Sequence, residues 1–188
     1  MATCIVSIAK IMPGCMLLNS LFVRHDIYAC STAGIDPNVA YKGHFGAVTG
    51  LHFHPHIAPV NFSDLLLTCG VDWSIKLWKI PFSHSTTGPQ TVAPLHSFEV
   101  ADDYILDVKW SPAHPSVFAS VDGSGKLDIW NLNSDMESPW KSIQVTEGKA
   151  LNRFQWDNSG RRGALGSSHG HVYIYDVGDV RCFKKKTL

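Results

Sequence analysis

The chain has 188 residues, and Lys plus Arg and Asp plus Glu both number 16, so its formal net charge is zero. Without a basic excess, the sequence favours neither nucleic acid nor an anionic membrane as a partner. A hydrophobic fraction of 45%, with 6 Trp and 9 Phe, predicts a folded domain with a substantial core. The 5 cysteines are scattered and form no Cys-x-x-Cys pair, which argues against a zinc ribbon or a disulfide framework and fits a reducing compartment.

The first residues, MATCIVSIAKIMPGCMLLNSLFV, are apolar and leave two interpretations open. A signal peptide needs an unbroken apolar core, and Lys10, Pro13 and Gly14 interrupt it here. The preferred interpretation is two short strands, 4–11 and 16–23, separated by a Pro-Gly turn. A strand at 27–31, a turn at 34–38 and an outer strand at 39–42 then complete a partial sheet.

Residues 43–79, GHFGAVTGLHFHPHIAPVNFSDLLLTCGVDWSIKLWK, carry the most informative pattern. Gly-His opens it, and alternating apolar residues predict strands at 47–54, 65–69 and 74–80. An Asp-bearing turn separates the last two strands, and a Trp ends the third. This order resembles one repeat of the WD-repeat family, whose repeats are the blades of a β-propeller.

The resemblance implies a hydrogen-bonded tetrad in this first blade. By matching position, Trp78 would donate to Thr68, which bonds His44, which in turn bonds Asp72. Buried polar groups need such partners, so the implied role is structural. A His-Thr-Asp set also suggests a catalytic triad, but triads are recognised by geometry and role, and the repeat accounts for every member.

Three alternating histidines, His52, His54 and His56, raise the possibility of a metal site. Zinc usually takes four ligands, and no Cys or carboxylate lies at a matching spacing, so structural or solvated histidines are the preferred interpretation. Beyond this blade's third strand, residues 81–94 are predicted to form a surface loop and residues 95–100 an outer strand.

The repeat recurs twice, with Trp78, Trp130 and Tyr175 at equivalent positions. The second copy keeps Ser120 and Trp130, but Ala101 and Ser124 stand where His and Asp are expected. This loss removes donor and acceptor together, so no orphaned charge is expected. In the third copy Glu147 falls near the His position and His169 at the Asp position, which suggests a pair with exchanged roles.

The expected fold is all-β: a partial WD-repeat β-propeller of about three complete antiparallel four-stranded blades plus fragments. Residues 1–42 would form an apolar N-terminal stretch and a partial blade. Blades one, two and three would occupy 43–100, 101–145 and 146–179, and a basic tail 180–188. Too few blades would be present to close a ring, so the chain is expected to be an open, association-prone arc.

Several strings go beyond a generic WD repeat: VDWSIKLW, LHSFEVADDYILDVKWSPAHPSVFASVDGSGKLDIWNLNSD, and ALNRFQWDNSG with VYIYDVGD. Over about 43–179 they resemble the C-terminal WD-repeat region of cytoplasmic dynein intermediate chains. The resemblance implies a non-catalytic scaffold subunit of a microtubule motor that binds the dynein heavy chain in the cytoplasm. The N-terminal arm that family members use for light chains and dynactin is not found in this sequence, so those partners are not carried over.

Partner contacts are expected at loops, because blade faces are buried against one another. The candidate contact residues are Asp102, Asp103, Tyr104, His114 and Trp140. For Trp140 the alternative is plain packing at the start of an outer strand. Because no P-loop, Gly-rich dinucleotide turn or zinc hydrolase motif is present, no cofactor and no enzyme activity are expected. The alternative function is a generic WD-repeat adaptor of another complex.

Overall fold

The computed structural model describes residues 21–23, 26–31, 34–57, 59, 61–80 and 90–178, with side chains from Ala40 onward. All regular structure in these residues is β-strand. The expected strand at 4–11, most of the strand at 16–23, and the basic tail 180–188 lie outside the described residues. No helix that could span a membrane occurs in the described part of the chain.

The N-terminal sheet has the order β1-β2-β3-β7. Its strands are β1 (Leu21–Val23), β2 (Asp26–Ser31), β3 (Gly34–Tyr41) and β7 (Gln90–Val92). Two expectations were wrong here, because residues 34–38 are strand rather than turn, and 90–92 are strand rather than loop. β7 pairs in parallel with β3, so β3 is not the outer strand. β7, which lies in the chain between β6 (Ile75–Lys79) and β8 (His96–Phe98), thus pairs with the backbone edge that β3 would otherwise leave open.

Two complete antiparallel sheets follow, which we call blades one and two. Blade one has the order β4-β5-β6-β8, from β4 (Val48–Phe53), β5 (Leu65–Gly70), β6 (Ile75–Lys79) and β8 (His96–Phe98). Blade two has the order β12-β11-β10-β9, from β9 (Ile105–Trp110), β10 (Val117–Asp122), β11 (Lys126–Asn131) and β12 (Lys141–Gln144). The central strand β5 is buried almost throughout, since both of its faces pack on neighbours.

Blade three has three strands in the described part of the chain. They are β13 (Leu151–Trp156), β14 (Arg162–Ser167) and β15 (Val172–Asp176), all antiparallel. With the N-terminal sheet, the structure therefore holds three four-stranded sheets and one three-stranded sheet. The expected all-β fold, an open and partial propeller, is confirmed.

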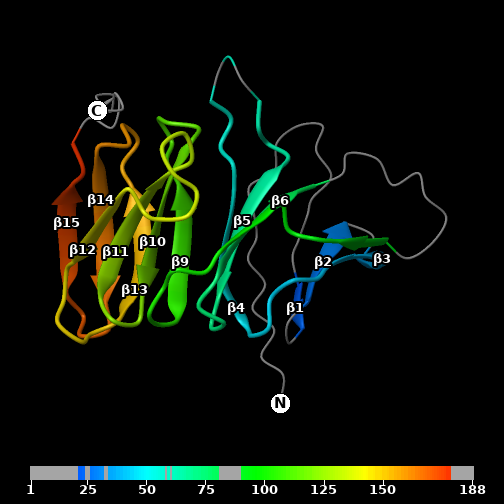
Figure 1. Ribbon diagram of the computed structural model, residues 1–188, viewed down its shortest axis with the longest axis horizontal. Coiled ribbons are helices and arrows are strands. Elements are labelled where there is room, and N and C mark those ends of the chain that lie inside the picture. Colours follow the sequence, from blue (N-terminus) through cyan, green and yellow to red (C-terminus); the bar gives the residue numbers. More distant parts are fainter. Residues whose placement is uncertain are drawn as a thin grey trace.

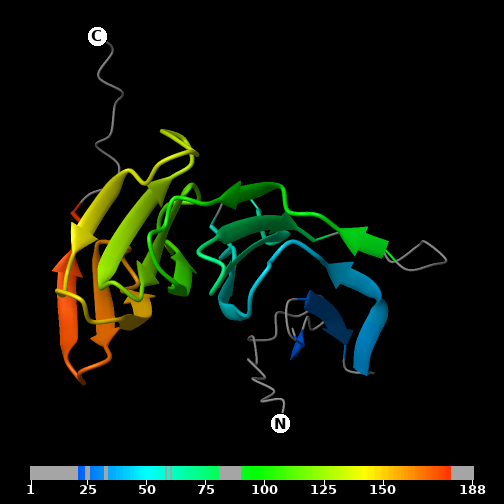
Figure 2. The same ribbon diagram turned by 60° about the horizontal axis from the view of Figure 1, so that its bottom comes forward.

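The sheets stand side by side along an open arc, from the N-terminal sheet to blade three (Figures 1 and 2). The first strand of each blade contacts the first strand of the next, β4 with β9 and β9 with β13. Three apolar clusters fill the spaces between successive sheets. The core is therefore built between blades, and each blade depends on its neighbours for burial.

Polar side chains on these first strands connect neighbouring blades. Thr49 donates to the Ile105 carbonyl, and His52 Nδ1 accepts the Trp110 backbone N–H at 3.0 Å. Asp107 repeats the arrangement one blade on, where its Oδ2 accepts the Phe154 N–H at 3.1 Å. Buried backbone N–H groups thus find partners across the blade boundary, which fixes the relative position of adjacent sheets.

Strand register shows which face of each blade meets the next. Ile75 and Leu77 on β6 are buried between blades one and two. Leu127 and Ile129 are the equivalents on β11, and both are fully buried between blades two and three. The equivalents on β15 are Val172 and Ile174, which are 71% and 66% exposed. The face of blade three that carries Val172 and Ile174 therefore has the same apolar pattern as the faces that blades one and two bury against the next blade.

Candidate functional site

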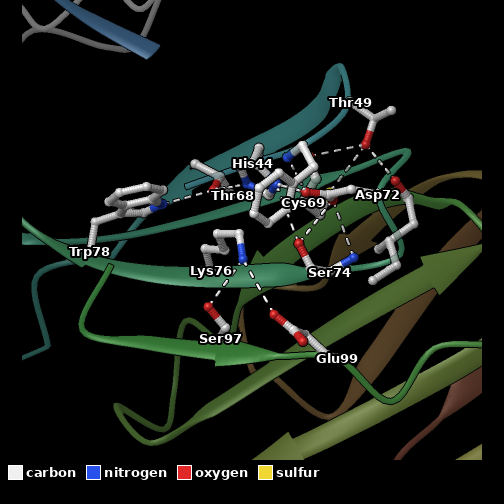
Figure 3. A network of polar contacts seen from close by, with 12 residues as sticks. His44, Thr49, Thr68, Cys69, Asp72, Ser74, Lys76, Trp78, Ser97 and Glu99 are labelled. Carbon is white, nitrogen blue, oxygen red and sulfur yellow. Dashed lines mark hydrogen bonds and ion pairs between the residues drawn. The ribbon is translucent and has the colours of Figure 1, made fainter. Parts of the chain in front are cut away.

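The structure brings His44, Thr68, Asp72 and Trp78, which we call the tetrad, into one connected network (Figure 3). His44 lies in the turn before β4, Thr68 on β5, Asp72 in the β5–β6 turn and Trp78 on β6. Trp78 Nε1 lies 2.8 Å from Thr68 Oγ1, and His44 Nε2 lies 2.7 Å from the same oxygen. His44 Nδ1 lies 2.9 Å from Asp72 Oδ2.

The donor and acceptor capacities of these four groups assign a direction to each hydrogen bond. Trp78 Nε1–H can only donate, and the Asp72 carboxylate can only accept. Nδ1–H of His44 therefore donates to Asp72, and the Thr68 hydroxyl accepts from Trp78 while donating to Nε2. A neutral imidazole satisfies every partner in this chain of bonds.

Asp72 has further partners that the sequence did not predict. Its Oδ2 accepts the Phe45 backbone N–H at 2.9 Å, and its Oδ1 accepts the Ser74 hydroxyl at 2.8 Å. Burial raises the pKa of the Asp72 carboxyl, but the hydrogen bonds from His44 and Phe45 outweigh burial and hold the pKa well below its usual range. A Ser two residues after an Asp in a turn is a recognisable signal, whereas the Phe45 bond depends on tertiary placement.

The burial of the tetrad fits a role in stabilising blade one rather than a role in chemistry on a substrate. Thr68 and Trp78 have no exposed surface, and the Thr68 hydroxyl is fully used between Trp78 and His44. The neighbouring thiol of Cys69 is also fully buried, and burial raises its pKa to about 12, so it carries no thiolate at neutral pH. Neither hydroxyl nor thiol is accessible as a nucleophile here.

Blade two keeps half of the network and replaces the rest. Trp130 Nε1 donates to Ser120 Oγ at 3.3 Å, as the aligned residues suggested. A carboxylate is nevertheless present, because Asp122 accepts from the Ser124 hydroxyl and the Lys126 N–H, both at 2.8 Å. Its other oxygen, Oδ2, is buried without a protein partner. The aligned residues did not predict this carboxylate, since Asp122 enters at the position equivalent to Gly70.

The described residues of blade three form no comparable network. Leu165 occupies the position equivalent to Thr68 and is fully buried, so no hydroxyl is available to link the other groups. Glu147 and His169 are both exposed and do not bond each other; His169 Nδ1 instead lies 3.2 Å from Ser167 Oγ. The suggested pair with exchanged roles was wrong, and apolar packing holds this blade.

The candidate contact residues lie at opposite ends of the blades. Asp102, Asp103 and Tyr104 precede β9, at the end where the tetrad turns also lie. His114 and Trp140 lie in the β9–β10 and β11–β12 connections, at the other end. Trp140 is half-buried and packs against the apolar cluster between blades two and three, which favours the packing interpretation for this residue.

Two of the three alternating histidines, His52 and His54, bond to backbone groups, and His56 is exposed. His52 Nδ1 accepts the Trp110 N–H, and His54 Nε2 lies 2.9 Å from the Pro115 carbonyl oxygen. Burial, with the positive charge of Lys109 nearby, lowers the pKa of His52 to about 4. Among the described residues no group of three or more His, Cys, Asp or Glu side chains is placed to hold a metal ion.

This fold, with antiparallel blades along an arc and an indole–hydroxyl–imidazole–carboxylate network in one of them, defines a WD-repeat β-propeller. The structure is similar to the WD40 domain of coronin from Toxoplasma gondii, with a TM-score of 0.71 and 20% identity, covering 84% of this chain and 40% of that one. In sequence, the chain resembles the cytoplasmic dynein 1 intermediate chain of Drosophila melanogaster, at 41% identity over 167 residues. That match covers 86% of this chain and 24% of the relative, so the chain spans about a quarter of the relative's length. No family model matches the chain.

Proposed function

We propose that the chain is a non-catalytic scaffold subunit of the cytoplasmic dynein motor and associates with the heavy chain through its blades. The observation that carries this proposal is the 41% identity to a cytoplasmic dynein 1 intermediate chain across 86% of the chain. The partners of a propeller bind mostly at its loops and rims, and the match extends across the blades that carry them. The proposed location is accordingly the cytoplasm, on microtubules.

The chemistry of the described residues supports the absence of catalysis in this role. The polar network that most resembles a catalytic site is buried and internally satisfied. The unpaired Asp122 oxygen is also buried, so it does not face a substrate. Scaffold function needs only a rigid fold with shaped loops, and the blade-to-blade hydrogen bonds provide that rigidity.

The partner that we propose is the dynein heavy chain, with other subunits joined through the complex. Light-chain and dynactin binding form no part of this proposal. The proposed blade boundaries are those of the sequence, 43–100, 101–145 and 146–179.

Affinity purification of the tagged chain from cell lysate, followed by mass spectrometry, tests the proposal. We expect dynein heavy chain among the proteins recovered with the unmodified chain. A variant of the chain with a disrupted blade-one network, used as a matched bait, should not recover the heavy chain. Thr68→Val is a suitable bait, because it keeps the shape of the side chain and removes the hydroxyl that joins Trp78 to His44. Recovery of a different complex without heavy chain would contradict the proposal and favour the generic WD-repeat adaptor.

A further inference from the structure

Three large aromatic side chains lie exposed at the tetrad end of blades one and two. Phe45 is 87% exposed, Tyr104 51% and Trp73 48%. We call these three residues the aromatic rim. Their exposure contrasts with the other tryptophans of blades one and two, of which Trp78, Trp110 and Trp130 are almost fully buried. Exposed aromatic groups gathered in one place mark interaction sites.

The rim is continuous across the boundary between the two blades. The Phe45 backbone N–H donates to Asp72, the residue before Trp73, at 2.9 Å. The rings of Trp73 and Tyr104 meet edge to face, with centroids 6.4 Å apart and an interplanar angle of 69°. The turn before β4, the β5–β6 turn and the turn before β9 therefore present one surface, although they are far apart in the sequence.

The turn between the second and third strand of each blade takes a residue with positive φ: Gly125 and Gly170 hold this position in blades two and three, with φ of 88° and 80°, and blade one has Trp73 there. Its φ is 62°, and it is the only non-glycine residue with positive φ among the described residues. A bulky side chain is strained in this region, and the glycines of blades two and three avoid that strain, so blade one keeps an exposed Trp where Gly would be easier to accommodate. Strained residues concentrate at binding sites, where the strain is part of function.

Carboxylates flank the aromatic rings on the blade-two side. The Asp102 side chain is 80% exposed and carries an ion pair to Lys126 at 3.1 Å. Asp103 lies next in the chain and accepts the Tyr104 N–H at 2.7 Å. Two carboxylates against one ammonium leave this side of the rim with an excess of negative charge. A group that stacks on aromatic faces and donates to carboxylates at the same time is a guanidinium.

We propose that the aromatic rim, with Asp102 and Asp103, is a docking surface for an arginine-bearing peptide segment of a partner protein. The arginine stacks on Trp73 or Tyr104 and donates to the carboxylates, and Phe45 receives the apolar part of the segment. Arginine fits better than lysine, because its planar fork stacks and donates simultaneously. This proposal goes beyond the proposed function, because it follows from the aromatic and carboxylate side chains of the rim. It does not depend on which protein carries the arginine-bearing segment.

Fluorescence anisotropy with the full chain and three labelled octapeptides tests this docking surface. The probes alternate Arg, Lys or Glu with Leu, so they share length and apolar content. We expect the Arg peptide to bind about tenfold or more tightly than the Glu peptide, and several-fold more tightly than the Lys peptide. Equal affinity for the Arg and Lys peptides would overturn the proposal, because charge alone would then explain binding.

Trp73→Gly is the decisive variant, since glycine accepts the positive φ and the fold is retained. We expect it to weaken Arg-peptide binding by about tenfold while leaving the melting temperature unchanged or raised. Tyr104→Ser is a second variant, and we expect it to weaken Arg-peptide binding as well. Met136→Gly is the control, because Met136 is 38% exposed in the β11–β12 connection, at the other end of the blades. Unchanged binding by Trp73→Gly and Tyr104→Ser would overturn the proposal.

Discussion

His52 on β4 and Trp110 on β9 are joined across the boundary between blades one and two, where His52 Nδ1 accepts the Trp110 backbone N–H at 3.0 Å. Only a neutral imidazole has a free lone pair at Nδ1 for this bond. Protonation would place a second N–H against a buried donor. This geometry agrees with a His52 pKa that burial lowers to about 4.

We expect this bond to make the fold acid-sensitive. The pKa of His52 is about 4 in the folded chain against an ordinary value of 6.5. The folded pKa is depressed, so the contribution is complete above pH 6.5 and is lost as the pH falls from 6.5 towards 4. Its size is at most about 3 kcal/mol of unfolding free energy. Chemical denaturation across this pH range measures it.

His52→Asn provides the matched test of acid sensitivity. An Asn oxygen can accept the same N–H without titrating, so the pH dependence should flatten between pH 6.5 and 4. His56→Asn is the control, because His56 is exposed. A pH profile that His52→Asn leaves as steep as that of the unmodified chain would contradict the role given to this bond.

Loss of the tetrad carboxylate should destabilise blade one. Asp72→Ala leaves His44 Nδ1 and the Phe45 N–H without their acceptor, and we expect a loss of about 1–3 kcal/mol. Ser124→Ala is the matched change in blade two, where Asp122 keeps the Lys126 N–H, and we expect a loss below about 1 kcal/mol. Thermal or urea unfolding measures both variants. Equal losses of unfolding free energy in the two variants would contradict the structural role given to Asp72 in blade one.

The outward face of blade three should promote association of the isolated chain. Val172 and Ile174 are equivalent to Leu127 and Ile129, which are fully buried between blades, yet they are exposed. We expect light scattering of the unmodified chain to show concentration-dependent association. The double variant Val172→Asp, Ile174→Asp should reduce it, because charge disfavours apolar face-to-face packing.

A control for association is Leu95→Asp, since Leu95 is 57% exposed but lies away from blade three. It should leave association unchanged. A monodisperse unmodified chain, or equal effects of the two sets of substitutions, would contradict the role of this face.

Trp140→Ala should act on stability rather than on a binding surface. The side chain is half-buried and packs against the cluster between blades two and three. Since full burial of an aromatic is worth about 3–5 kcal/mol, we expect a loss of about 2 kcal/mol and a lower melting temperature. Reduced heavy-chain recovery at an unchanged melting temperature would show that Trp140 is a contact residue instead.

Local pattern was sufficient for most of the fold. Alternating apolar residues and the Gly-His and Trp positions located the strands of blade one, because each feature is set by neighbours in the chain. The parallel strand β7 could not be predicted, since its partner β3 is more than 40 positions earlier and the stretch before it is rich in Ser, Gly and Pro. Long-range pairing leaves little trace in a single sequence.

The tetrad was likewise predictable from the local sequence pattern, whereas other features of the site were not. The positions of His44, Thr68, Asp72 and Trp78 follow from the repeat, and the structure brings them together. Asp122 was missed, because its carboxylate enters two residues before the position at which the repeat carries Asp. Trp73 was missed for another reason: exposure and backbone strain at a turn cannot be recognised from residue type.

Direct binding between the purified chain and purified cytoplasmic dynein heavy chain tests the central claim most directly. Analytical ultracentrifugation of the mixture should show the two sedimenting as one complex, while Thr68→Val, with its blade-one network broken, should bind less. Separate sedimentation of the unmodified, folded chain and the heavy chain would contradict the claim that this chain is a heavy-chain scaffold.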